Sequence, residues 1–183
     1  MNETSEPKKQ FGIQKLYVKD ASFESPTSPQ SFSFKKWNPK IELNLTNDQK
    51  HIDGDVYEVV LSVTLTVSHE ETTAFLVEVH QAGLFEIAGF DDEQKNFLLG
   101  SQCMTILFPY AREAVSDLSV RGGFPPLTMS PVNFDALYQQ HQQRKQAEQA
   151  EQAEQAEQAE QAEQAEQAEQ AEQAEQGKTG APH

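Results

Sequence analysis

An alternation of apolar and polar side chains over residues 56–67, VYEVVLSVTLTV, constrains the fold more than any other stretch of the chain. The apolar face would carry Tyr57, Val59, Leu61, Val63, Leu65 and Val67. The opposite face would carry Glu58, Ser62, Thr64 and Thr66. A period of two is typical of a strand that is buried on one face and solvated on the other. The stretch therefore predicts a strand with one buried face and one partly solvated face.

A second alternating stretch follows at residues 73–81, after a short polar connection. One face would hold Phe75, Val77 and Val79, and the other Leu76, Glu78 and His80. Short connections favour antiparallel neighbours. Two more strands are expected at residues 11–24 and 32–45, the latter with a bulge or an edge position at Asn38-Pro39 and a polar loop at 47–55 after it.

The following segment predicts helices. Residues 82–90 are expected to be an apolar crossover, and Asp91 or Asp92 can cap the next helix. Its apolar stripe would consist of Phe97, Met104, Leu107, Phe108, Ala111, Val115 and Leu118. Pro109 predicts a kink or a break in this helix, and Gly122-Gly123 predicts its end. Residues 124–131 are expected to be extended, and another helix is expected to begin near Asn133. The fold class is therefore α+β.

Ten consecutive Ala-Glu-Gln repeats occupy residues 147–176. All three residue types favour helix, but a period of three drifts around a 3.6-residue turn and builds no apolar stripe. We expect a flexible N-terminus at 1–10, one domain at 11–145 and a solvated, partly helical acidic tail at 146–183.

The charge and the cysteine count narrow the class of function. The formal net charge is −15, and the part before the repeats is also acidic, which argues against nucleic-acid binding and suits basic partners. Cys103 is the single cysteine, and no stretch approaches the length of a membrane span or a signal-peptide core. A cytoplasmic protein without membrane insertion is expected.

Motifs for catalysis are weak. Gly177-Lys178-Thr179 lacks the upstream glycine of a phosphate-binding loop, and the five histidines lie far apart in the sequence. His80 and Glu78 share a strand face, which leaves a small His/Glu enzyme as a rival interpretation with an enclosed pocket. We expect no enzymatic activity, no cofactor and no metal.

Many aromatic side chains lie at the ends of the expected elements and in connectors, where one short sheet and two helices cannot cover them all. Each brings about 150–250 Å² of surface. Such surface favours contact with another subunit or with a bound peptide. The residues themselves leave both alternatives open.

Five stretches of the chain resemble the bacterial protein-export chaperone family SecB. They are IQKLYVKDASFESP at 13–26, DVYEVVLSVT at 55–64, TAFLVEVHQAG at 73–83, LFPYARE at 107–113 and SPVNFDALY at 130–138. The resemblance implies a four-stranded antiparallel sheet with helices on one face and a homotetramer built as a dimer of dimers. It also implies ATP-independent binding of unfolded preproteins and their delivery to the translocase ATPase SecA.

The resemblance also implies roles for particular residues. SecA docking would fall on Asp20, Glu24, Leu76 and Glu78. Subunit contacts would fall on Val77, Val79 and Gln81. The preprotein groove is assigned to Trp37, Phe90, Phe97, Phe108, Tyr110, Phe124 and Phe134. A SecB-like chaperone of a toxin–antitoxin pair is the other alternative, and the Ala-Glu-Gln tail departs from the family's short C-terminal end.

Overall fold

The structure, a computed structural model, describes residues 8–33, 36–153 and 155. The chain divides into two units, Met1–Tyr138 and Gln139–His183. The first unit holds the sheet and the helices packed on it. None of the helices in the described part of the chain is long and apolar enough to cross a bilayer.

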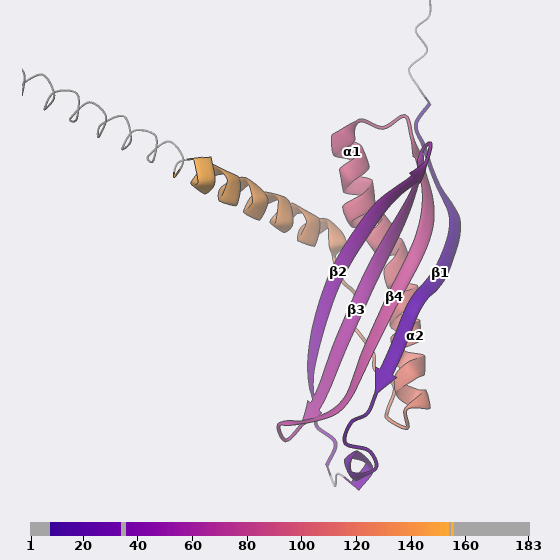
Figure 1. Ribbon diagram of the computed structural model, residues 1–183, viewed down its shortest axis with the longest axis vertical. Helices are drawn as coiled ribbons and strands as arrows, with labels where there is room; N and C mark the ends of the chain where they lie inside the picture. Colours follow the sequence, from indigo (N-terminus) through magenta and orange to yellow (C-terminus); the bar gives the residue numbers. More distant parts are fainter. Residues whose placement is uncertain (1–7, 34–35, 154, 156–183) are drawn as a thin grey trace, which may run out of the picture. The chain divides into compact units, whose positions relative to one another are not determined.

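The first unit is built on a four-stranded antiparallel sheet, as predicted (Figure 1). Its strands are β1 (Gln10–Glu24), β2 (Lys40–Asp53), β3 (Val56–His69) and β4 (Thr72–Ala88). The spatial order is β1-β4-β3-β2, so β4 and β3 are the inner strands and β1 and β2 form the edges. The helices lie together on one side of the sheet, which leaves the other side open.

The core lies between the sheet and the helices. The predicted faces of β3 and β4 are confirmed, because Val59, Leu61, Val63, Leu65 and Val67 are buried, as are Phe75, Val77 and Val79. The helical layer consists of α1 (Asp92–Phe97), a π-helical turn η2 (Leu98–Gln102) and α2 (Cys103–Arg121). Helix α2 buries Met104, Leu107, Phe108, Ala111 and Val115 against the sheet. Most of the predicted stripe is therefore core.

The predicted bounds of two strands were wrong. Strand β2 begins at Lys40 and runs to Asp53, through the predicted polar loop, while Phe32 lies in a short 3-10 helix, η1 (Gln30–Ser33). The end of β2 is an exposed edge strand held by its ladder to β3, so apolar alternation is not required there. Strand β4 includes residues 82–88 of the predicted crossover, with Phe85 and Ile87 buried.

Gly83 explains why β4 continues through a segment rich in small residues. A β-carbon at this position would lie 2.6 Å from Phe85 Cε2 and 2.9 Å from Leu16 Cδ2. The glycine therefore makes room for the apolar side chains that cover this end of the sheet. In the sequence alone it resembles a loop residue.

The predicted break at Pro109 was also wrong. Helix α2 continues through Pro109, which is exposed, and the irregularity is the π-helical turn before it. At an exposed position the carbonyl that loses its partner can bond to water. The predicted cap is confirmed at Asp91, whose Oδ1 accepts a hydrogen bond from the Gln94 amide at 2.8 Å.

The connector after α2 leads to a last helix. Gly122 caps α2, Gly123 has a φ of 85°, and residues 124–133 have no regular structure. Asn133 Oδ1 accepts from the Ala136 amide at 3.0 Å, which confirms the helix start predicted near Asn133. Residues 134–153 are helical, so the described repeats at 147–153 are helix, and most of the tail prediction lies outside the described residues.

Candidate docking face on the open side of the sheet

The register of β1 and β4 brings the four predicted docking residues together. Across this ladder Asp20 is opposite His80, and Glu24 is opposite Leu76. Ser22 is opposite Glu78. Directly opposed residues project to the same side of a sheet. Asp20, Glu24, Leu76 and Glu78 therefore lie on the open side of the sheet. We call the part of the open side that these four residues form, with the side chains next to them, the docking face.

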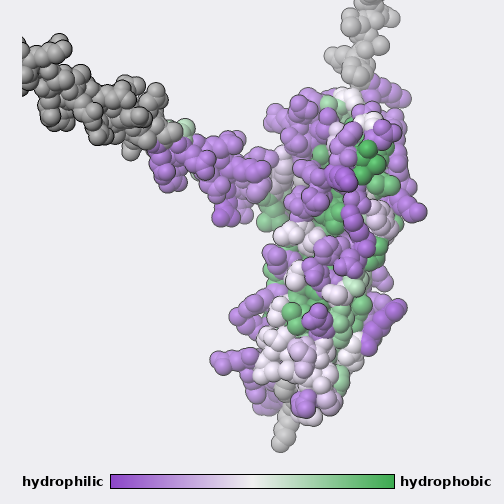
Figure 2. Space-filling view, viewed as in Figure 1, coloured by the Kyte–Doolittle hydropathy of each residue, from purple (hydrophilic) through white to green (hydrophobic). Residues whose placement is uncertain are grey.

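The docking face presents uncompensated negative charge. Asp20, Glu24 and Glu78 are exposed, and Leu76 is half-buried between them. Among the described residues, no lysine or arginine forms a salt bridge with these three carboxylates. Figure 2 shows hydrophilic residues over much of the surface in this view, with hydrophobic residues between them. A basic surface of a partner protein is the complementary ligand.

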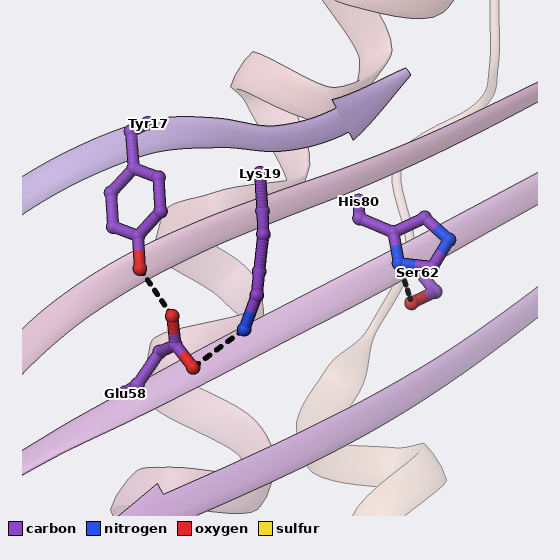
Figure 3. A network of polar contacts seen from close by, with 5 residues as sticks. All are labelled: Tyr17, Lys19, Glu58, Ser62 and His80. Atoms are coloured by element: carbon purple, nitrogen blue, oxygen red, sulfur yellow. Dashed lines mark hydrogen bonds and ion pairs between the residues drawn. The ribbon is translucent and has the colours of Figure 1, made fainter. Parts of the chain in front are cut away.

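A neighbouring carboxylate is neutralised within the protein. Glu58 on β3 accepts a hydrogen bond from the Tyr17 hydroxyl, and its Oε2 lies 2.7 Å from Lys19 Nζ (Figure 3). Lys19 and Tyr17 lower the pKa of the Glu58 carboxyl, and the Glu58 carboxylate raises the pKa of the Tyr17 hydroxyl to about 12. Glu58 therefore adds little free charge to the open side.

The sequence did not predict this network. Tyr17 and Lys19 lie on β1, and Glu58 lies on β3 with β4 between the two strands. The three side chains meet only because the strand order places β4 next to both. A strand order of this kind is not visible in the local pattern.

His80 contacts Glu78, as their shared strand face predicted. His80 Nε2 lies 3.0 Å from Glu78 Oε1, and His80 Nδ1 lies 3.4 Å from Ser62 Oγ on β3 (Figure 3 shows the second contact). The Glu78 side chain is 47% exposed. The pair lies on an open surface and does not form the enclosed pocket that the enzyme interpretation requires.

The predicted subunit-contact residues project toward α2. Val77 and Val79 are fully buried, and Gln81 is 3% exposed with its Nε2 donating to the Tyr17 carbonyl at 3.0 Å. All three already pack inside one protomer. A role in assembly would therefore act through this packing, and it stays a prediction.

The predicted groove residues fall into three places. Phe108, Phe124 and Phe134 are core. Trp37, Phe90 and Phe97 are half-buried at its margin, and Tyr110 is 50% exposed on α2. Phe124 is the centre of an aromatic cluster with Phe75 at 4.4 Å, Phe32 at 5.2 Å and Trp37 at 5.6 Å between ring centroids.

The side of the sheet that carries the helices keeps apolar surface uncovered. Ile41 and Leu43 on edge strand β2 are paired with Val67 and Leu65, so they share the buried face of β3. They are nevertheless 48% and 44% exposed. Their alternation predicts an ordinary strand, and the predicted groove does not include them. Together with Tyr110 they offer apolar area for a ligand or a second subunit.

The described residues offer little for metal or thiol chemistry. No group of three or more His, Cys, Asp or Glu side chains among them is arranged to hold a metal ion. Cys103 is buried, and burial raises its pKa to about 12, so the thiolate is suppressed.

An antiparallel sheet with one helix-covered apolar side and one open acidic side defines a protein-binding scaffold with a SecB-like chaperone fold. A SecB-like chaperone of Mycobacterium tuberculosis, solved with an antitoxin peptide, shares this fold with a TM-score of 0.57 and 20% identity, over 67% of this chain and 90% of that one. The family model described as preprotein translocase subunit SecB matches residues 4–145. The chain belongs to the SecB family.

Curated relatives carry the same family name. The protein-export protein SecB of Methylococcus capsulatus is 57% identical over 138 residues, which cover 75% of this chain and 88% of the relative. That of Nitrosococcus oceani is 56% identical over 72% of this chain and 80% of the relative. That of Pseudomonas aeruginosa is 55% identical over 74% and 83%. The resemblance stated from the sequence is confirmed, and the chain is a protein-export chaperone.

Proposed function

We propose that this chaperone holds unfolded preproteins without nucleotide and releases them to the translocase ATPase SecA. Clients contact apolar surface on the helix side of the protein, and SecA docks on the acidic open side. The protein works by binding and not by catalysis. It acts in the cytoplasm as a homotetramer built as a dimer of dimers.

The observation that carries this proposal is the separation of two surfaces on one sheet. Ile41 and Leu43 project to the helix side and remain about half exposed, whereas Glu24 and Glu78 project to the open side. A chaperone that must be emptied by a partner needs a client surface and a partner surface that do not overlap. The two sides of this sheet provide them.

Apolar burial explains how clients of many sequences are accepted. Contacts with Ile41, Leu43 and Tyr110 are non-directional and select exposed apolar segments over a particular sequence. A folded client hides such segments, so slow-folding chains are preferred. Several protomers in one assembly would add avidity for a long unfolded chain.

The relatives support export over the toxin–antitoxin alternative. The neighbour solved with an antitoxin peptide is only 20% identical and shows a shared fold. The relatives above 50% identity described above are all named as protein-export proteins. The docking face, with three acidic side chains on two neighbouring strands, also favours delivery to a basic partner surface.

A refolding experiment tests the proposal. A slow-folding preprotein is diluted from denaturant with and without the purified chaperone, in the absence of nucleotide, and the chaperone is sized by chromatography in parallel. Arrest of refolding by a tetrameric species supports the holding function. Unchanged refolding at a several-fold molar excess would overturn it.

A further inference from the structure

His80 lies on the docking face, next to two of its acidic residues, Asp20 and Glu78. Its register partners are Asp20 on β1 and Ser62 on β3, and Thr46 on β2 is opposite Ser62. The imidazole therefore lies among side chains from the neighbouring strands. Its side chain is 32% exposed, so it is accessible to a docked partner and still held by its neighbours.

Two contacts fix the imidazole. Both contacts are satisfied by a neutral ring whose Nε2–H donates to Glu78 Oε1 at 3.0 Å and whose Nδ1 accepts from the Ser62 hydroxyl at 3.4 Å. A protonated ring satisfies them too, by donating from both nitrogens. The hydrogen bond to the imidazole limits the rotamers of the Glu78 side chain. A carboxylate held in one position loses less conformational entropy on docking than a free one.

The charges near His80 are predominantly negative. On the open side β1 contributes Lys15, Lys19, Asp20 and Glu24, β4 contributes Glu78 and Glu86, β3 contributes Glu58, and β2 contributes Lys40, Glu42, Asp48 and Lys50. Lys40 pairs with Glu42. Lys19 and Glu58 pair with each other. Asp20 and Glu78 therefore remain as the free charges next to the ring, and a proton on His80 would offset one of them.

We propose that His80 is a positioning and specificity-determining residue of the docking face, an inference that rests on the proposed docking of SecA. The neutral ring orients the Glu78 carboxylate toward a basic partner. The protonated ring adds a positive charge between Asp20 and Glu78 and weakens the attraction. Docking should therefore be weaker when the imidazole is protonated than when it is neutral.

The test measures SecA affinity by isothermal titration at constant ionic strength, at about pH 5.5 and pH 8. The probe is SecA of the same organism, and the full-length chaperone is used. His80→Gln keeps an uncharged hydrogen-bond donor, and His80→Ala removes the contact with Glu78. His141→Gln is the matched control, because it removes an exposed imidazole outside the sheet unit.

The expected result is a larger loss of affinity on acidification for the wild type than for His80→Gln, by about three- to tenfold for one charge pair near the surface. His80→Ala should bind more weakly than His80→Gln at the higher pH, and His141→Gln should follow the wild type. Urea denaturation checks that all variants are folded. This pattern would support both the positioning and the charge role.

Two other outcomes distinguish a failure of the role proposed for His80 from a failure of the proposed SecA docking. If the wild type binds, Glu78→Gln binds more weakly, and the pH profiles of wild type and His80→Gln superimpose, the role of His80 is overturned while docking stands. If neither the wild type nor any variant binds SecA at either pH, docking itself is overturned, and the role of His80 with it.

Discussion

Gly122 at the end of α2 lies directly against the ring of Phe23 on β1, where a β-carbon would be only 2.0 Å from Phe23 Cζ. The ring has little room to yield, because it stacks on Phe75 with centroids 5.5 Å apart and also contacts Phe124. This close approach joins the end of the helical layer to an edge strand of the sheet.

Gly122→Ala is expected to lower the free energy of unfolding by about 1–3 kcal/mol, because the added methyl forces the packed ring or the helix end to move. Urea denaturation measures the change. Gly12→Ala on β1 is the control, since its β-carbon would meet only Glu86 Cβ at 4.0 Å. A loss no larger than that of the control would contradict the packing described for Gly122.

Phe124→Ala and Tyr110→Ala should have different effects, because Phe124 is a core residue and Tyr110 belongs to the proposed client-binding surface. Phe124 is 6% exposed at the centre of the aromatic cluster, so its truncation should cost about 3–5 kcal/mol of stability. Tyr110 is 50% exposed, so its loss should change stability by less than about 0.5 kcal/mol and weaken client holding instead. Unchanged client affinity in a folded Tyr110→Ala variant would remove Tyr110 from the proposed client surface.

The turn between β3 and β4 offers a stabilising change. Glu70 and Glu71 have φ of 47° and 64°. Glycine adopts this left-handed region readily and asparagine does so at times, but other residues rarely do. Glu71→Gly should raise the free energy of unfolding by about 0.5–1 kcal/mol because the strain at this position is relieved. Glu93→Gly in the first turn of α1 should do the opposite. Thermal denaturation of both variants checks the signs.

The network around Glu58 should appear in the pH dependence of stability. Its folded pKa is lowered below the ordinary 4.5, so its contribution is present above that value and is lost as the pH falls through the folded pKa. Glu58→Gln should cost about 1 kcal/mol near neutral pH, and the difference from wild type should shrink on acidification. The Tyr17 hydroxyl has a pKa raised from 10.0 to about 12, so the stability that its hydrogen bond to Glu58 provides should be lost as the pH rises from 10 toward about 12.

Glu42→Gln is the control for that titration. Glu42 also has a lowered pKa, because Lys40 lies 2.7 Å away, but both side chains are largely exposed and water screens the pair. Its stability curve should superimpose on that of the wild type. A pH-independent difference between Glu58→Gln and wild type would contradict the network.

The inner strands could be predicted from sequence because burial on one face imposes a period of two. Val63 and Val79 are fully buried, whereas Thr64 and Glu78 are not, as the alternation predicted. The same alternation is enough to place Leu76 and Glu78 together on the face of β4 that points away from the core. Their proximity to Asp20 and Glu24 depends on the β1–β4 register, which local patterns do not contain.

The wrong predictions share one physical cause, which is that long-range pairing overrides local preference. The polar end of β2 is a strand because β3 provides its hydrogen bonds, and Gly83 stays in β4 because Phe85 and Leu16 occupy the space of a side chain. Pro109 stays in a helix because the residues of α2 before and after it pack on the sheet.

The most direct test of the two-surface account is SecA-driven release by the Glu78→Lys variant. The variant should arrest preprotein refolding as well as the wild type, while release by SecA should fall by about tenfold or more because charge is reversed on the docking face. Glu113→Lys, the same charge change at an exposed site on α2, should release normally. Equal release by Glu78→Lys and Glu113→Lys, or loss of holding by Glu78→Lys, would contradict the account.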